Sequence, residues 1–253
     1  MGAQVSRCLR CFPPLPFSST KEPLSETVPL HTEDKSFVSP TSGIELELLD
    51  DHSSVRVLES LDKAHRAVLE LVEREDLDTL VETAEVRVCG KVSVRGYCLR
   101  TVWETAVGKE RVMEFFRRAD LRPTWDVNME SCRVVSQGEY TVTYQLYKKV
   151  MAVSPRDMVL ASKAYNQAQA LLDVSTSIDT PDCPPRDNVI RARVFAGGFR
   201  TETTEMGLTR VMLMTEIDFG GVIPKSVMLR MSAMNMPMFI KHLSQGLLKD
   251  ASI

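Results

Sequence analysis

The spacing of hydrophobic residues along the chain changes from helical to alternating and back. Between residues 54 and 75, Leu61, Val68 and Val72 keep to one face at helical spacing, which predicts an amphipathic helix. A second helical pattern covers residues 108–121. The two patterns predict one helix before and one helix after residues 86–107, which are rich in β-branched residues.

In the segments of the chain that are rich in β-branched residues, hydrophobic and polar residues alternate as they do in β-strands. Glycine and proline residues separate the segments. Gly197 and Gly198 predict the tip of a hairpin between two of the strands. The expected strands are residues 86–95, 97–107, 129–135, 140–151, 158–166, 170–178, 189–196, 199–205 and 208–219.

The last predicted strand ends at Gly220 and Gly221, and Pro224 suits the first turn of a helix. We expect this helix to extend to about Lys249. A helix, a run of strands and a long C-terminal helix indicate the α+β class. The strands lack the intervening helices of a parallel sheet, so we expect an antiparallel one.

The first part of the chain has no sustained hydrophobic period. From about Phe12 it is rich in proline, serine, threonine and acidic residues, a composition typical of a flexible tether. We therefore expect a disordered N-terminal tether over residues 1–53 and a single folded domain over residues 54–253.

The N-terminal residues resemble a lipidation signal. Met1 to Ser6 match the pattern M-G-x-x-x-[ST], in which Gly2 becomes myristoylated after Met1 is removed. One myristoyl chain holds a protein at a membrane only marginally, so a second signal is needed. Cys8 and Cys11 are placed for S-palmitoylation. The sequence therefore predicts a lipid anchor.

Composition excludes several classes of protein. The net charge of -3 and the hydrophobic content of 43% are ordinary for a globular protein and argue against a collagen-like chain or a strongly basic nucleic-acid binder. The 6 cysteines show no metal-like clustering with histidine, so we expect reduced thiols, no metal site and no cofactor. We also find no transmembrane run or secretory signal.

Four short motifs follow one another in the predicted domain. They are Trp125-Asp126, Ser154-Pro155-Arg156-Asp157, Val189-Ile190-Arg191-Ala192, and Asp218 to Pro224. Their order and spacing resemble the StAR-related lipid-transfer (START) domain, and the resemblance covers residues 54–248. Met158 stands where the family has phenylalanine or valine, which keeps the position apolar.

The resemblance implies a helix-grip fold of the START/Bet v 1-like type, in which a curved antiparallel sheet surrounds a long C-terminal helix. It also implies that a single lipid lies in a tunnel between them and is bound, transferred or sensed without catalysis. Burial of an acyl chain is favourable by ~0.8 kcal/mol per CH₂, which requires an apolar lining. The predicted hairpin at Gly197 and Gly198 would cover the tunnel mouth and insert into a membrane.

The resemblance also suggests which polar residues contact the lipid. Asp126 and Gln145 look similar to an acid and a glutamine that contact the lipid in the ceramide-binding branch. Asp173 and Leu213 stand where that branch has asparagine and tyrosine. Two of the four positions therefore differ, and the ligand stays open among a sterol, a phospholipid and a sphingolipid.

The other branches of the family are not favoured more strongly. The carboxylate–arginine pair of the cholesterol-binding branch is not evident, since Ser162 stands near the arginine position. The phosphatidylcholine carrier of the family has an aromatic cage for choline, and Trp103 would contribute to such a cage through a cation–π contact. Arg191 lies in the middle of a predicted strand and would either face solvent or reach a lipid headgroup.

The predicted C-terminal helix is unusually rich in methionine, since 5 of the 13 methionines lie between Met228 and Met238. Methionine adapts to variable apolar partners. We expect this helix to be a gate that faces the lipid, and the alternative is a fully buried core helix. Pro237 is expected to kink or loosen it. The predicted lipid contacts are Met228, Met231, Met234 and Met238.

No catalytic residues are expected. The alternative function is an enzyme, a cyclase or hydrolase of an apolar substrate on the same fold, with Asp126 and Asp173 as a buried carboxylate pair. The expected partners are a lipid ligand and a membrane surface, with no nucleic acid, and we expect a monomer. The expected location is the cytoplasmic face of the plasma membrane or an endomembrane, or the cytoplasm.

Overall fold

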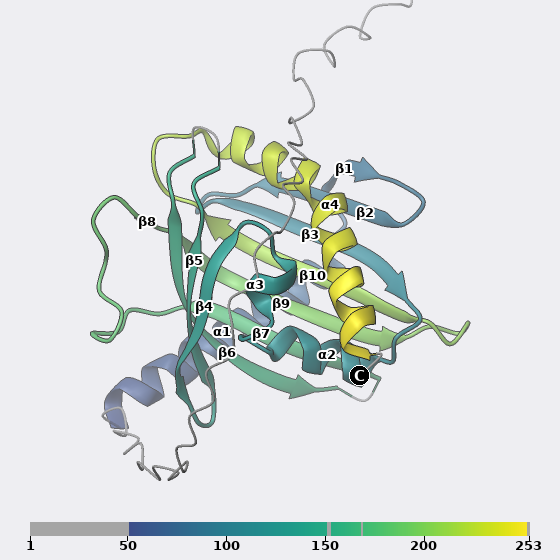
Figure 1. Cartoon of the computed structure of the whole chain (residues 1–253), viewed down its shortest axis with the longest axis horizontal. Coiled ribbons are helices and arrows are strands. Elements are labelled where there is room, and N and C mark those ends of the chain that lie inside the picture. Colours follow the sequence, from purple (N-terminus) through teal and green to yellow (C-terminus); the bar gives the residue numbers. More distant parts are fainter. Residues whose placement is uncertain (1–50, 151–152, 168, 252–253) are drawn as a thin grey trace, which may run out of the picture. The chain divides into compact units, whose positions relative to one another are not determined.

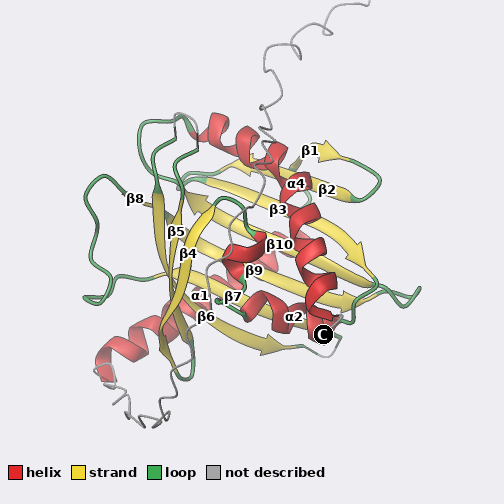
Figure 2. Cartoon of the chain, in the orientation of Figure 1, coloured by secondary structure: helices red, strands yellow, loops and turns green. Residues whose placement is uncertain are grey.

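The computed structural model describes residues 51–150, 153–167 and 169–251. Gly2, Cys8 and Cys11 lie outside the described residues, as does the predicted tether before Asp51. In the described part, a 10-stranded sheet curves around the C-terminal helix (Figures 1 and 2). The predicted α+β helix-grip fold is confirmed.

The helices and strands follow the predicted order. The helices are α1 (Asp51–Glu73), α2 (Lys109–Arg117), α3 (Arg122–Trp125) and α4 (Lys225–Ala251). The strands are β1 (Asp78–Glu82), β2 (Val86–Val92), β3 (Tyr97–Thr105), β4 (Met129–Gln137), β5 (Thr141–Tyr147), β6 (Arg156–Asn166), β7 (Ala170–Ser177), β8 (Ile190–Arg191), β9 (Arg193–Thr203) and β10 (Thr209–Asp218).

The strand order in the sheet is β1-β2-β3-β10-β9-β7-β6-β5-β4, and neighbours on this path are antiparallel. The short strand β8 pairs with β6 in parallel. β1 was not predicted, because Asp78–Glu82 is short and mostly exposed. The helical pattern of residues 108–121 ends earlier than expected, at Arg117, and Pro123 lies in the first turn of the separate helix α3.

Alternating residues of β7 show how the two faces of the sheet are used. Leu172 and Val174 belong to a buried cluster that α1 completes through Val68 and Leu71. Asp173, between them, points to the opposite face. On that face α2 packs on β7 and β9, while α4 packs on β1, β2 and β3. The helices therefore cover both faces of the sheet.

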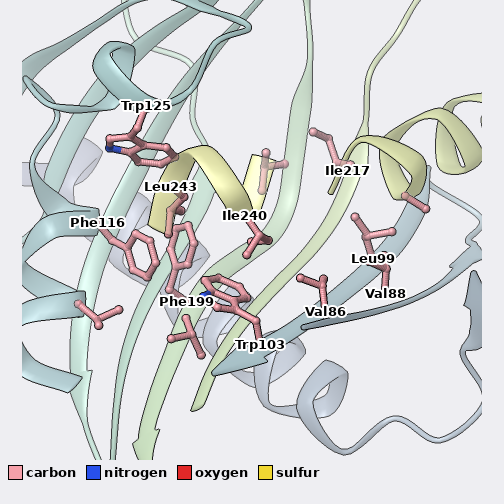
Figure 3. Close-up of a cluster of buried hydrophobic side chains, with 14 of the residues drawn as sticks. Val86, Val88, Leu99, Trp103, Phe116, Trp125, Phe199, Ile217, Ile240 and Leu243 are labelled. Atoms are coloured by element: carbon pink, nitrogen blue, oxygen red, sulfur yellow. The ribbon is translucent and has the colours of Figure 1, made fainter. Parts of the chain in front are cut away.

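The largest buried cluster joins the sheet to α2, α3 and α4 (Figure 3). The rings of Phe116 and Phe199 are stacked with centroids 3.9 Å apart. Trp125 meets Phe239 of α4 edge-on, at a centroid distance of 5.6 Å. Aromatic pairs of this kind add specific geometry to apolar burial. The cluster fixes α2, α3 and α4 against the sheet.

β9 continues through Gly197 and Gly198, so the predicted hairpin tip at these glycines is wrong. The two glycines pair with Thr215 and Met214 of β10, and they are buried instead of placed to enter a membrane. A Cβ on Gly198 would lie 2.4 Å from the carbonyl oxygen of Asp173. Glycine is needed here because the backbones of β7 and β9 approach closely.

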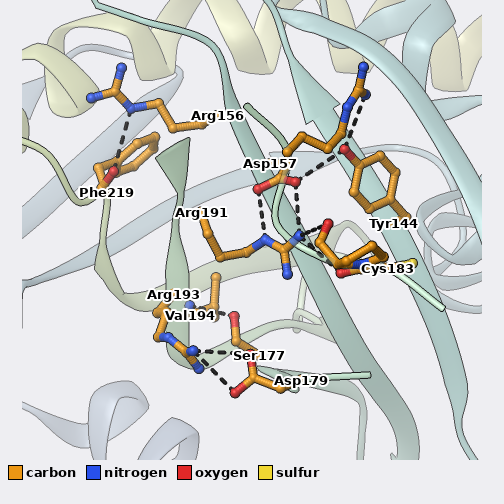
Figure 4. Close-up of polar contacts among 12 residues, drawn as sticks. Tyr144, Arg156, Asp157, Ser177, Asp179, Cys183, Arg191, Arg193, Val194 and Phe219 are labelled. Carbon is orange, nitrogen blue, oxygen red and sulfur yellow. Dashed lines mark hydrogen bonds and ion pairs between the residues drawn. The ribbon is translucent and has the colours of Figure 1, made fainter. Parts of the chain in front are cut away.

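A buried ion pair joins β6 to β8 (Figure 4). Asp157 accepts hydrogen bonds from Nε and a terminal nitrogen of Arg191 at 2.7 and 3.0 Å, and one from the Tyr144 hydroxyl at 3.1 Å. Arg156 does not share this pair, because neighbouring strand residues point to opposite faces. Its guanidinium instead donates to the carbonyl oxygen of Phe219 at 3.4 Å. Of the Arg156-Asp157 motif, Asp157 therefore forms an ion pair, and its partner is Arg191.

Replacement of Gly198 by alanine is expected to lower the free energy of unfolding by roughly 1–3 kcal/mol. The new methyl group would meet the backbone oxygen of Asp173, which no change of rotamer can move away. Denaturation by urea would measure the loss. Gly138→Ala is the control, because a Cβ there meets nothing within 4 Å, and equal stability of the two variants would contradict the interpretation.

Candidate functional site

A cavity of about 350 Å³ lies between the sheet and α4. Residues of β3, β5, β6, β7, β9 and β10 line it from the sheet side, and residues of α2, α3 and α4 line it from the other side. The volume lies within the range of small-molecule sites. The curvature of the sheet around α4 therefore leaves room for a ligand.

Most of the cavity wall is hydrophobic. Leu99, Leu160 and Leu213 come from three strands, and Phe116 and Phe199 form the stacked pair described above. Helix α4 adds further apolar side chains, which are Met228, Met231, Met236 and Phe239. An apolar ligand would be shielded from water over most of its length here.

β5 contributes a row of polar side chains to the cavity. Thr141, Thr143, Gln145 and Tyr147 all line it, because alternate residues of the strand share one face. The Tyr147 hydroxyl donates to Oε1 of Gln145 at 3.0 Å, and Nε2 of Gln145 donates to Oγ1 of Thr143 at 3.3 Å. The row is a hydrogen-bonded network of groups that remain able to accept or donate further bonds.

Charged residues gather where α2 and α3 meet the cavity. Arg117, Arg122, Asp126 and Asp173 all line it, and Lys148 lies on the loop after β5. Nε of Arg117 lies 3.6 Å from Oδ1 of Asp173. Oδ1 of Asp126 accepts a hydrogen bond from the backbone N–H of Asn128 at 3.3 Å. These charged residues, the polar row of β5 and Arg156 of β6 thus interrupt a mostly apolar wall.

Burial changes the protonation of the two carboxyl groups. It raises the pKa of Asp173 to about 7, against the opposing effect of Arg117 and Arg122. Burial also raises the pKa of Asp126, although Arg122 opposes it. Desolvation disfavours the charged form of a carboxyl group. Near neutral pH, Asp173 is therefore present in both its charged and neutral forms.

One hydrogen bond ties the cavity-facing side of α4 to the sheet. The hydroxyl groups of Tyr97 on β3 and Ser232 on α4 lie 2.7 Å apart. The opposite side of the helix faces solvent, where Met234 and Met238 are 66% and 44% exposed. The methionines of α4 thus belong to two different surfaces.

The comparisons with known proteins agree with this architecture. The START domain family model matches residues 79–251. The chain belongs to the START domain family. No curated protein matches the sequence.

Solved structures of START proteins share the fold. Human StAR-related lipid transfer protein 5 superposes with a TM-score of 0.72 at 18% identity, over 78% of this chain and 99% of that one. Human STARD10 gives a TM-score of 0.67 at 20% identity, over 83% of this chain and 84% of that one. The lipid transfer and protein localization domain of human StarD13 gives 0.60 at 14% identity, over 72% and 94%. At these identities the likeness shows the fold alone.

Six of the ten predicted lipid contacts line the cavity of this START domain. They come from the loop after α3 and from β5, β7, β10 and α4, and only the tertiary structure brings them together. The sequence separates the first from the last by about 100 residues. The six residues are Asp126, Gln145, Asp173, Leu213, Met228 and Met231.

The other four predicted contacts lie outside the cavity. Trp103 is buried in the core, where it packs edge-on against Phe116. Arg191 is held by Asp157 on the other face of the sheet (Figure 4). Met234 and Met238 face solvent because they lie on the outer side of α4. In the described part of the chain, neither Asp126 nor Asp173 is among the groups that shift the pKa of the other.

The sequence analysis missed several polar and charged residues of the cavity. Arg122 precedes Trp125 by three residues, one turn of helix, and Tyr147 follows Gln145 on the same face of β5. The period of two in β5 indicates the position of Tyr147. Nothing in the pattern indicates Arg122, because α3 has only 4 residues.

In the described part of the chain, no group of three or more histidine, cysteine, aspartate or glutamate residues could hold a metal ion. No described helix is both long and apolar enough to cross a membrane.

Replacement of Asp173 by asparagine is expected to increase stability more at high pH than at low pH. The pKa of Asp173 is about 7 in the folded protein, against about 3.9 in an unfolded chain. Between these values the folded state binds more protons than the unfolded state, so ionisation of Asp173 lowers stability as the pH rises. Asparagine cannot ionise and removes this loss.

Urea denaturation of Asp173→Asn and wild type at about pH 5 and pH 8 would measure the effect. The stabilising effect of the substitution should be roughly 2 kcal/mol larger at the higher pH. Asp187→Asn, at an exposed position, is the control and should show no such difference. If Asp173→Asn changes the free energy of unfolding equally at both pH values, burial does not raise the pKa of Asp173.

Proposed function

We propose that this START domain binds one lipid in the cavity beneath α4 and transfers it between membranes or senses it there, without changing it chemically. The observation that carries the proposal is a mostly apolar cavity wall that also has polar and charged groups, gathered on β5 and where α2 and α3 meet the cavity. A lipid has both kinds of group. The proposal also agrees with the names of the StAR-related lipid transfer protein and the lipid transfer domain that share the fold.

The apolar wall supplies the free energy that extraction of a lipid requires. Each CH₂ group of an acyl chain that leaves a membrane for water costs ~0.8 kcal/mol. The leucine, phenylalanine and methionine side chains of the cavity would replace the membrane interior. Methionine suits this role because its unbranched side chain adjusts to ligands of different shape.

A lipid could enter if α4 moved away from the sheet. Gly220 and Gly221 have φ of 64° and 79°, a region that favours glycine, and they lie in the loop before α4, which begins at Lys225. Pro237 lies within α4 and has no N–H to donate to the preceding turn. We propose that these sites allow the N-terminal half of α4 to open as a gate.

The chemistry of the cavity favours a carrier over an enzyme. Among the histidines with described side chains, His65 and His242 do not line it. The hydroxyl and amide groups of β5 bond to each other instead of forming a nucleophile with an adjacent base. Asp126 and Asp173 are not paired. These groups are suited to orienting a ligand.

We also propose that the N-terminus anchors the domain to a membrane. The proposal rests on the sequence of Gly2, Ser6, Cys8 and Cys11, which match the signals for myristoylation and palmitoylation. Two acyl chains would hold the protein stably on the cytoplasmic face of a membrane. An anchored domain would meet its lipid at a high effective concentration.

Leu213→Trp is expected to abolish most lipid binding and transfer, because the larger side chain on β10 would fill the cavity. Native mass spectrometry of the purified protein would show the bound lipid, and transfer between liposomes would measure the activity. The control is Met206→Trp, at a position that is 86% exposed and does not line the cavity. Absence of any bound or transferred lipid in the wild-type protein would overturn the proposed function.

Gly2→Ala is expected to move the full-length protein from the membrane fraction to the soluble fraction, because alanine cannot accept myristate. Fractionation of cells that express each form would measure the change. Cys8→Ser with Cys11→Ser should weaken the attachment but leave the N-terminal myristate in place. If Gly2→Ala stays at the membrane, the myristoyl anchor is excluded.

A further inference from the structure

A second hollow lies beside the cavity, between α2 and one end of strands β4 to β7. Its volume is about 700 Å³. Residues that line it include Met113 and Arg117 of α2, Val134 of β4, Ala164 of β6 and Leu171 of β7. We call this hollow the α2 groove. The function proposed above makes no use of it.

The cavity and the α2 groove are continuous along strand β6. Alternate residues from Arg156 to Ser162 line the cavity, and the next two residues on the same face, Ala164 and Asn166, line the groove. Strand β7 repeats this arrangement, since Asp173 lines the cavity and Leu171 lines the groove. The two spaces therefore form one passage along the concave face of the sheet.

An ion pair stands where the two spaces meet. Arg117 and Cys132 are among the residues that line both of them. Nε of Arg117 on α2 lies 3.6 Å from Oδ1 of Asp173 on β7, so the pair spans the passage. This distance is longer than that of an N–H···O hydrogen bond, and half of the Arg117 side chain is exposed. The pair can therefore separate, with Arg117 moving toward solvent.

The two ends of the passage differ in chemistry. At the start of β6, Arg156 donates to the carbonyl oxygen of Phe219 in the loop before α4, so this end lies at the proposed gate. At the other end, charged side chains of both signs line the groove, among them Glu110, Arg118 and Asp120. Charged groups lose water when an acyl chain covers them, which is unfavourable. The groove end therefore suits water better than lipid.

A lipid that enters the cavity has to displace water. The cavity volume of 350 Å³ equals that of about twelve water molecules at ~30 Å³ each. Polar side chains such as Gln145 and Asp173 bind water when no ligand covers them. A lipid that enters beneath α4 fills that opening, and the membrane interior behind it does not take up water. The water needs a separate way out.

We propose that the α2 groove is a second mouth of the cavity, through which water leaves as a lipid enters beneath α4, and that the Arg117–Asp173 ion pair limits this flow. The inference rests on the proposed function, because it concerns how the lipid is loaded. A route changes the height of a barrier but neither end state, so loading and release change by the same factor. A residue that binds the lipid changes its affinity instead.

Ala164→Trp is expected to slow both loading and release by about 5- to 10-fold and to change the equilibrium fraction of loaded protein by less than about twofold. The indole would fill the groove from an exposed position outside the cavity. Stopped-flow fluorescence would measure both rates with full-length protein and phosphatidylcholine vesicles. The vesicles carry dehydroergosterol, a fluorescent ceramide or a fluorescent phosphatidylcholine as the probe.

The matched control is Ala84→Trp, at an exposed position that lines neither space, and its rates should equal those of wild type. This variant carries the same additional tryptophan, so it also controls for the fluorescence signal. Arg117→Ala should raise both rates by a similar factor, because alanine cannot pair with Asp173. A general loss of folding cannot explain faster loading, so Arg117→Ala decides the question if thermal melting shows that Ala164→Trp is unfolded.

Cys132 allows a test of the passage that needs no lipid. A water-soluble methanethiosulfonate reagent would modify the thiol, and mass spectrometry of peptides would follow the rate at Cys132 separately from the buried Cys89, Cys98 and Cys183. Because thiol reactivity depends on access, Ala164→Trp should slow this reaction by about fivefold or more and Arg117→Ala should accelerate it.

The results separate this inference from the proposed function. If both variants load and release lipid at wild-type rates, or if Cys132 reacts equally fast in both, the second mouth is excluded and lipid binding still stands. If the rates change only as far as the loaded fraction does, the groove binds lipid and is not a route for water. If no probe loads into the wild-type protein, the proposed function fails, and this role of the groove fails with it.

Discussion

Helix α4 has to border an open cavity and also be held firmly in the core, and it meets these demands with different halves. Its cavity-lining residues all lie between Met228 and Phe239. Beyond them, Leu243 and Leu247 are almost fully buried, and Gly246 lies so close to Trp125 that a Cβ there would be 3.0 Å away. The C-terminal half of α4 is therefore the fixed part, and Pro237 stands near the boundary.

The space beneath α4 depends on the sheet that surrounds it. Close approach of β7 to β9 requires glycine at 198, where any side chain would collide with the backbone of Asp173. Because side chains of a strand alternate, the same strands present Leu172 and Val174 to α1 and Asp173 to the cavity. Packing against α1 thus fixes the position of a charged group on the other face.

The charged groups of the cavity are costly for the folded protein. A buried carboxyl with a raised pKa and a buried guanidinium nitrogen without a partner both reduce stability in the absence of a ligand. Groups that lower stability and face a cavity are characteristic of binding sites. Charged groups at one place in a mostly apolar cavity can orient a ligand.

The sequence by itself determined the α+β class, the antiparallel sheet, the long last helix and, through four spaced motifs, the START family. It also placed Asp126, Gln145 and Met228 at the cavity, because period and motif specify which residues point inward. It failed at Gly197 and Gly198, since a glycine pair that permits two strands to approach looks the same in sequence as one that makes a turn. Only the tertiary structure assigned Arg191 to Asp157, separated Met231 from Met234, and left Nε of Arg122 without a hydrogen bond. The reason is that each of these outcomes depends on atoms brought together from distant parts of the chain.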